Sequence, residues 1–265
     1  MTLIIGIKCS DGIVLGADSA ATMSTATGLE TIVQAMPKLE IVKDKVIVGV
    51  SGPLGLGQLY TDRVDKVCDD IGNRDAPEVC RKLRSEFIQD AQIAFQMAAL
   101  AVNVLGPQAR ASVASSMLVA LAAKNNELQL IEFDSQCNPE IVSPDIAFSS
   151  IGIGKSIADP FLALIKHLFW KEHHLPSMSD GNFAVVWTLQ HAINTAPSGI
   201  RGPIQMAVLT IEGKQPKARK LTREEVIEHE ENASQAEDYF RKYKDEHKPS
   251  VTEPEPPQPP KIHSS

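Results

Sequence analysis

The chain has 265 residues, a hydrophobic fraction of 43% and a formal net charge of −7. This length allows a large hydrophobic core, and the negative charge gives no electrostatic reason to expect a nucleic-acid or membrane partner. The sequence has no apolar stretch close to the twenty residues that span a bilayer and no basic segment like that of a signal peptide, so we expect a cytoplasmic protein.

Residues 2–19 predict a β-hairpin with a hydroxyl group at one end. Two apolar runs, 3–7 and 13–17, lie on either side of an Asp-Gly turn. The start of the first strand and the end of the second lie side by side in such a hairpin, which places Asp18 near Thr2. A threonine hydroxyl beside the chain's own terminal amine, with a carboxylate close by, is typical of an N-terminal nucleophile.

The first half of the chain continues with a loop, a second hairpin and two helices. Residues 20–36 are small and rich in threonine, which favours a loop with at most short strands. Residues 38–52 alternate apolar and polar positions around a charged turn and predict the second hairpin. Helical spacing of apolar residues begins at 54 and ends near 71. The next helix begins after Asp75 and ends before Gly106.

The second half repeats this order of strands followed by helices. Residues 112–123 and 128–133 predict an antiparallel pair, and the β region continues to 148. Helices are expected at about 156–169 and 180–195, before a last strand at 204–211. Because strands cluster with strands and helices with helices, a βαβ array is disfavoured. We predict an α+β fold in which two antiparallel sheets are sandwiched between helical layers.

Composition divides the chain into three parts. Residues 1–213 form the expected folded domain. Residues 214–248 are strongly charged with few apolar positions, which suits an exposed helix with opposite charges along its surface. Residues 249–265 include six prolines and predict a disordered tail.

We expect no metal and no cofactor. The four cysteines are widely spaced without a CxxC pair, which indicates free thiols, and the histidines do not cluster as zinc ligands do. The segment Gly152–Ser156 nearly matches a phosphate-binding loop, but Ser149 stands where the first glycine is required. A glycine-rich turn from a strand to a helix is the better interpretation.

The order of four motifs resembles proteasome β-type subunits, which are N-terminal-nucleophile hydrolases. The motifs are Thr2, the segment 12–22 (GIVLGADSAAT), Lys38-Leu39 and Ser51-Gly52. The chain looks most similar to the bacterial branch called the betaproteobacterial proteasome homologue, over about residues 2–211. The resemblance implies a four-layer αββα fold and self-assembly into two stacked heptameric rings with the sites facing an inner chamber. It also implies an ATP-dependent unfoldase as a regulator.

The resemblance also implies roles for individual residues. Thr2 matches the nucleophile once Met1 is removed, Asp18 and Lys38 match the charged pair beside it, and Gly52 matches the backbone donor for the oxyanion. The residues that would line the pocket for the substrate side chain are Ala21, Met36, Val50 and Leu54. These four residues are mostly apolar and favour cleavage after hydrophobic residues, whereas Glu40 near the rim opposes that preference.

The sequence departs from the family pattern around the proposed site. Ala20 stands where family members often carry arginine, and the loop between Thr22 and Lys38 is longer than usual. Ile153 replaces the serine of a Gly-Ser-Gly segment. The supporting Asp and Ser before the final strand are not in register, and their neighbourhood is occupied by Pro197, Ser198 and Ile200. We therefore expect few polar groups around Thr2, Asp18 and Lys38.

These patterns predict a threonine endopeptidase that cleaves proteins or peptides inside a compartment. Two alternatives stay open: a ring or scaffold subunit with a decayed site, and a small-molecule amidase of the same nucleophile class. A monomer or dimer would contradict a chambered protease. Labelling of Thr2 by threonine-directed electrophiles would separate an active site from a decayed one.

Overall fold

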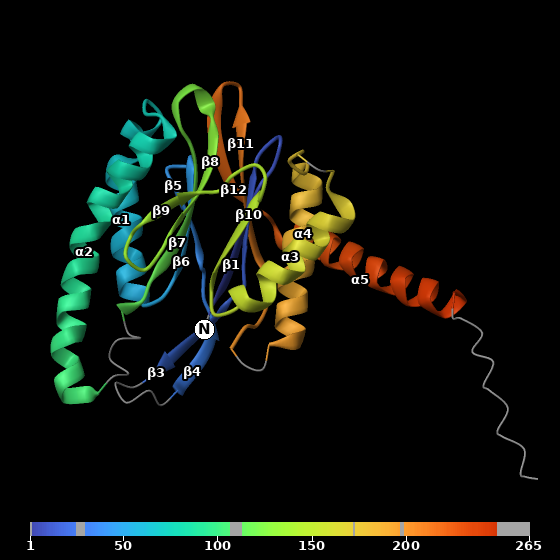
Figure 1. Cartoon of the computed structure of the whole chain (residues 1–265), viewed down its shortest axis with the longest axis horizontal. Coiled ribbons are helices and arrows are strands. Elements are labelled where there is room, and N and C mark those ends of the chain that lie inside the picture. Colours follow the sequence, from blue (N-terminus) through green and yellow to red (C-terminus); the bar gives the residue numbers. More distant parts are fainter. Residues whose placement is uncertain (1, 25–29, 107–112, 172, 197–198, 248–265) are drawn as a thin grey trace, which may run out of the picture.

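Two five-stranded antiparallel sheets lie face to face between two layers of helices (Figure 1). The computed structural model describes residues 2–24, 30–106, 113–171, 173–196 and 199–247. The first sheet has the order β10 (Phe148–Gly152), β1 (Leu3–Lys8), β2 (Ile13–Ala17), β11 (Gln205–Glu212), β12 (Gln215–Lys220). The second has the order β5 (Leu39–Val42), β6 (Val46–Ser51), β7 (Ser116–Ala122), β8 (Leu128–Phe133), β9 (Pro139–Ile141).

Strand β1 is buried on both faces, which explains its nearly continuous apolar sequence. Alternate residues of a strand point to opposite sides of the sheet. Leu3 and Ile5 pack in the apolar cluster under the helices, whereas Ile4 packs in the cluster between the two sheets. The cluster between the sheets also includes Leu15 and Leu118, one from each sheet. Burial of both faces therefore fixes the register of the first hairpin, since a slip of one residue would move the side chains of each cluster to the opposite face of the sheet.

Each sheet is covered by a pair of helices. Helices α1 (Leu54–Ile71) and α2 (Ala76–Leu105) cover the second sheet, and α3 (Lys155–Phe169) and α4 (Met178–Thr195) cover the first. The Asp75 side chain caps α2 by accepting the backbone N–H of Glu78, as its sequence position predicts. These layers confirm the αββα fold. Within the described ranges, no helix combines the length and the apolar character needed to cross a membrane.

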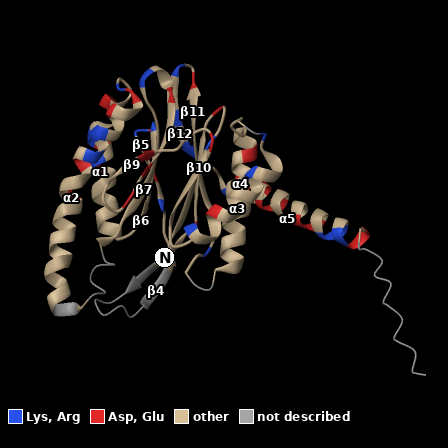
Figure 2. Ribbon diagram, viewed as in Figure 1, with Lys and Arg blue, Asp and Glu red and all other residues tan. Residues whose placement is uncertain are grey.

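Helix α2 divides into a charged first half and an uncharged second half. Residues 91–105 contain no Asp, Glu, Lys or Arg, and Figure 2 shows this half of the helix without charge colours. Three of its apolar residues, Ile93, Met97 and Leu100, have exposed fractions of 60%, 62% and 64%. Their i, i+4, i+7 spacing places them on one face of the helix. Helix α2 therefore carries an apolar stripe that the described part of the chain leaves exposed.

Two segments of the chain differ from the sequence-based expectations. Residues 20–36 were expected to be mainly a loop, but β3 (Ala20–Ser24) and β4 (Glu30–Ala35) form a two-stranded sheet. Threonine favours strands even without apolar alternation, and this segment lacks that alternation. The expected last strand, 204–211, is followed by β12, which pairs with β11 in the first sheet. Residues 215–220 thus belong to the sheet, because the pairing of β12 depends on its backbone rather than on its side chains, half of which are charged.

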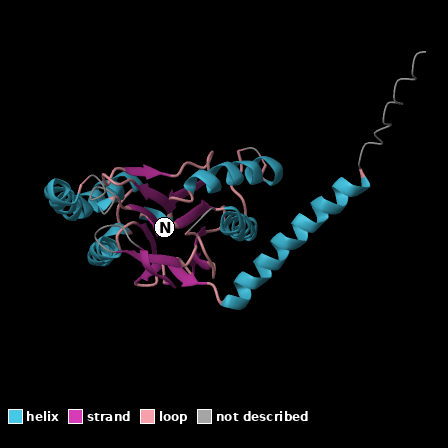
Figure 3. Cartoon of the chain, turned by 90° about the horizontal axis from the view of Figure 1, so that it is seen from below, coloured by secondary structure: helices cyan, strands magenta, loops and turns pink. Residues whose placement is uncertain are grey.

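The expected C-terminal helix is α5 (Arg223–Glu246). A capping box formed by Thr222 and Glu225 begins it. Trp187 of α4 donates its indole N–H to Glu237 at 3.0 Å and stacks on Phe240, and α5 then extends away from the layered domain (Figure 3). The proline-rich tail predicted at 249–265 lies outside the described residues.

Candidate active site

The first hairpin places Asp18 beside the backbone of Thr2. In the pairing of β1 with β2, Ile4 lies opposite Ala17, so Asp18 follows directly on the strand that flanks the start of the chain. The Asp18 carboxylate accepts the N–H of Leu3 at 2.8 Å and the N–H of Ala20 at 3.1 Å. Its side chain is fully buried. These two backbone donors hold the carboxylate in place before any ligand binds.

Lys38 connects this carboxylate to the Thr2 hydroxyl. It precedes β5, and its Nζ lies 2.7 Å from Oδ1 of Asp18 and 3.2 Å from Oγ1 of Thr2. Burial lowers the pKa of Lys38 from its usual value, while the Asp18 charge and hydrogen bond act to raise that pKa. The structure therefore brings together three of the four residues expected to be catalytic, and it places a cation where negative charge on the Thr2 oxygen would be stabilised.

Gly52, the fourth expected catalytic residue, lies in the turn between β6 and α1. Its φ of +139° is rarely adopted by residues with a side chain. A Cβ atom there would lie 2.6 Å from the carbonyl oxygen of Ala114 and 2.8 Å from the Cα of Ser115. Glycine is therefore required by both backbone conformation and space. Gly52 and Thr2 line the same cavity.

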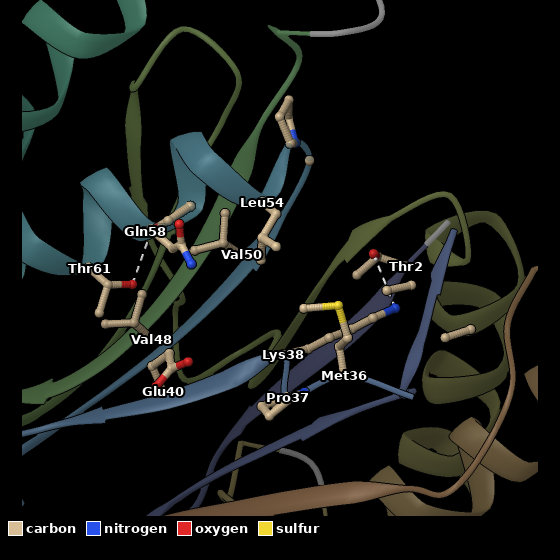
Figure 4. A pocket seen from close by; sticks show the side chains of 15 residues that line it. Thr2, Met36, Pro37, Lys38, Glu40, Val48, Val50, Leu54, Gln58 and Thr61 are labelled. Carbon is tan, nitrogen blue, oxygen red and sulfur yellow. Dashed lines mark hydrogen bonds between the residues drawn. The ribbon is translucent and has the colours of Figure 1, made fainter. Parts of the chain in front are cut away.

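This cavity has a volume of about 370 Å³. It lies between the β5–β6 hairpin and the first turns of α1, with Thr2, Met36 and Lys38 on the opposite side (Figure 4). The four residues expected to line the substrate pocket are all part of its wall: Ala21, Met36, Val50 and Leu54. Glu40 also belongs to the wall. The cavity has the size and the mainly apolar lining that are typical of ligand pockets.

Gln205 is a supporting residue that the sequence analysis missed. Its Oε1 accepts the backbone N–H of Lys38 at 3.0 Å, and its Nε2 donates to the Ser19 hydroxyl and to the Met36 carbonyl, both at 2.7 Å. The Ser19 hydroxyl in turn donates to the carbonyl of Pro203. These hydrogen bonds fix the segment that carries Lys38, although few polar supports were expected. The sequence signal that could have identified this residue is a glutamine at the start of a mostly apolar strand.

The Gly152–Gly154 turn holds the backbone of Thr2. The N–H of Gly154 donates to the Thr2 carbonyl at 3.3 Å. Gly152 has a φ of +94°, and a Cβ there would lie 2.2 Å from the same oxygen. Ile153, which replaces the family's serine, has an exposed fraction of 62%, whereas Ile200 is buried against Gly154. Pro197 and Ser198 lie outside the described residues. The two glycines permit a close approach that larger residues would prevent.

The cysteine thiols are buried and held in their unreactive form. All four cysteines are free and buried. Burial raises the pKa of the Cys80 thiol to about 11 and also raises the pKa of Cys9. The thiolate form is therefore scarce near neutral pH. In the part of the chain that the structure describes, no group of His, Cys, Asp or Glu residues is arranged to hold a metal ion.

A sequence model of the family described as "Proteasome subunit" matches residues 2–163. No curated protein sequence matches the chain. Among solved structures, an Anbu (Gly-1) mutant from Hyphomicrobium sp. strain MC1 superposes with a TM-score of 0.65 at 10% identity, over 94% of this chain and 99% of that one. Anbu, described as an ancestral beta-subunit, from Yersinia bercovieri gives 0.64 at 11% identity, over 95% and 100%.

A third structure is described as a helical assembly of the Anbu complex from Pseudomonas aeruginosa. It gives a TM-score of 0.66 at 14% identity, over 99% of this chain and 100% of that one. Identities this low establish a shared fold, and they leave the chemistry to be argued from the site itself.

Proposed function

The chain belongs to the proteasome subunit family, and we propose that it is a threonine endopeptidase whose nucleophile is Thr2 after removal of Met1. One observation carries this proposal. Nζ of Lys38 lies 3.2 Å from the Thr2 hydroxyl oxygen and 2.7 Å from the buried Asp18, beside a cavity of about 370 Å³. The hydrogen bonds of Gln205 argue against a decayed site, since they position Lys38.

The acylation step uses the amine that Met1 removal would expose. A free α-amine has an ordinary pKa of about 7.7–8.0, so part of it is neutral near physiological pH and can take the proton of the Thr2 hydroxyl. The Thr2 oxygen attacks the peptide carbonyl carbon, and the π electrons move to the carbonyl oxygen. The N–H of Gly52 and the positive end of α1 would stabilise this oxyanion. The C–N bond then breaks, and the leaving amine takes the proton held by the α-amine.

Deacylation repeats this sequence with water. The α-amine takes a proton from water, and the resulting hydroxide attacks the ester carbonyl. The C–O bond to Thr2 breaks, its oxygen regains a proton, and the carboxylic acid product leaves. Throughout the cycle Lys38 stays protonated beside Asp18, so it stabilises the negative charge that forms on the Thr2 oxygen.

We further propose that the subunits assemble into a chamber of two stacked heptameric rings, which would admit unfolded proteins or peptides supplied by an ATP-dependent unfoldase. Family membership and the apolar stripe of α2 support an assembly of copies. The Pseudomonas aeruginosa Anbu complex is described as a helical assembly. An open helical arrangement is therefore a result that imaging of the particle must distinguish from closed rings.

The decisive test combines mass spectrometry with substitution of Thr2. The purified protein should have the mass of a chain without Met1, and Thr2→Ala should lower peptide cleavage at least about a thousandfold. Thr2→Ala should also abolish labelling by an electrophile that reacts with N-terminal threonine. Thr2→Ser is the matched control, because it keeps a hydroxyl beside the amine and should retain part of the activity.

Two results would contradict the proposal. A retained Met1 in a protein that cleaves peptides would remove the amine from the mechanism. Full activity of Thr2→Ala would exclude Thr2 as the nucleophile. An assembled particle without cleavage or labelling would instead favour the scaffold subunit, and an active monomer would favour the small-molecule amidase.

A further inference from the structure

Glu40 projects into the cavity because of its position on strand β5. Leu39 is fully buried between the two sheets, and alternate residues of an extended chain point to opposite sides. Lys38 and Glu40 therefore lie on the other side, separated by about 6.5 Å along the chain. In the β5–β6 pairing Glu40 lies opposite Val48. Figure 4 shows Glu40 beside Val48 and Thr61, at the far end of the cavity from Thr2.

The Glu40 carboxylate is the uncompensated charge of this cavity. Among the described residues that line it, only Lys38 and Glu40 have charged side chains. The Lys38 cation is offset by the buried Asp18 at 2.7 Å. No hydrogen bond or ion pair joins Glu40 to another residue of the described ranges. A substrate side chain that enters from Thr2 would thus meet a carboxylate without a partner.

The wall between Thr2 and Glu40 suits a long aliphatic stem. Met36, Val48 and Val50 contribute apolar surface along this path. Arginine and lysine pack their methylene groups on apolar surface while the charged end reaches a polar partner. A shorter or wholly apolar side chain would leave the carboxylate without an ionic partner.

We propose that Glu40 determines specificity by selecting peptides with arginine or lysine immediately before the scissile bond. This inference rests on the proposed function, because it assumes that Thr2 attacks the carbonyl of the residue held in this cavity. It replaces the preference for hydrophobic residues that the apolar lining alone favours. A hydrogen bond between a carboxylate and a guanidinium or ammonium group is stronger than one between neutral groups.

The test compares three fluorogenic peptides that differ only in the residue before the cleaved bond: arginine, leucine or glutamate. The unmodified protein should show the highest kcat/KM with arginine. Glu40→Gln keeps the shape and removes the charge, so it should lower the arginine-to-leucine ratio of kcat/KM about tenfold to a hundredfold. Glu40→Lys should raise the glutamate-to-arginine ratio. Glu231→Gln on α5 removes the same charge far along the sequence from the cavity residues and should leave the ratios unchanged.

The outcomes separate this inference from the proposed function. If the N-terminal-threonine electrophile labels Thr2 and the peptides are cleaved, but Glu40→Gln leaves the arginine-to-leucine ratio unchanged, the role of Glu40 is wrong and the peptidase stands. If Thr2→Ala cleaves all three peptides as well as the unmodified protein does, the peptidase proposal fails first. A ratio that falls in Glu40→Gln but not in Glu231→Gln supports both.

Discussion

At the scale of single residues, the site depends on a buried pair of opposite charges. Burial disfavours the Lys38 cation, and Asp18 at 2.7 Å restores part of its stability, with burial the larger effect. The net result is a lysine pKa below its ordinary value of 10.5. Lys38 should therefore lose its proton at a lower pH than an exposed lysine does.

This pair predicts a bell-shaped pH dependence of kcat/KM. Activity should rise with the deprotonation of the α-amine, whose ordinary pKa is about 7.7–8.0. It should fall again below pH 10.5, as Lys38 loses its proton. Asp18→Asn removes the group that raises the Lys38 pKa, so the alkaline limb should move to lower pH. Asp62→Asn, which changes an exposed ion pair on α1, should leave that limb in place. An alkaline limb that Asp18→Asn does not move would mean that Lys38 is not the titrating group.

At the scale of secondary-structure elements, the turn from β6 into α1 positions the proposed oxyanion donor. Gly52 has a positive φ, and a Cβ atom added to it would lie within 3 Å of backbone atoms of Ala114 and Ser115. Three residues later, Gly55 has nothing within 4 Å of an added Cβ. Backbone conformation and space therefore require glycine at position 52 in the turn, whereas neither requires it at position 55 in the first turn of α1.

Gly52→Ala and Gly55→Ala should accordingly behave differently. Gly52→Ala forces the turn to move and displaces its N–H, so kcat should fall about a hundredfold to a thousandfold. Gly55→Ala adds a better helix-forming residue to an open position and should raise stability by up to about 1 kcal/mol. Circular dichroism and thermal melts check that both variants fold. Equal activity of the two variants would argue against Gly52 as the donor.

At the scale of the whole molecule, the uncharged half of α2 is the candidate surface for contact with another copy of the chain. Monomeric soluble proteins rarely expose contiguous apolar patches larger than a few hundred Å². Ile93, Met97 and Leu100 form a continuous stripe, and each is about three-fifths exposed. Contact with another copy in an assembly would remove this surface from water and stabilise the particle.

Met97→Glu places a charge in the middle of this stripe and should reduce the size of the particle. Burying an unpaired carboxylate at an interface is costly, so the variant should elute as smaller species in size-exclusion chromatography. Arg81→Glu reverses a charge on the exposed, charged half of the same helix and should leave the particle intact. Circular dichroism of Met97→Glu should match that of the unmodified protein, because the side chain is exposed in the single chain. A particle of unchanged size would exclude this stripe as an interface.

The sequence by itself predicted most of the elements and named the candidate site residues. Apolar periodicity, the Asp75 cap and the glycines after 71 and 105 located the helices, because these signals act within a few residues. The hairpin around Asp11 and Gly12 was enough to place Asp18 near Thr2, since antiparallel pairing fixes which ends meet. The family resemblance added Lys38 and Gly52, which local reasoning alone would have treated as a surface charge and a turn.

Only the tertiary structure decided which distant residues complete the site. Gln205 supports Lys38 across 167 positions, and β12 joins the sheet through backbone hydrogen bonds. Neither contact has a local pattern, because both depend on how the sheets and loops meet in space. The family resemblance placed Glu40 only near the rim of the substrate pocket. The packing of α1 over β5 and β6 makes it part of the cavity wall. Sequence therefore supplied the chemical groups of this site, and long-range packing supplied their partners, because burial and the pairing of charges are properties of the folded chain.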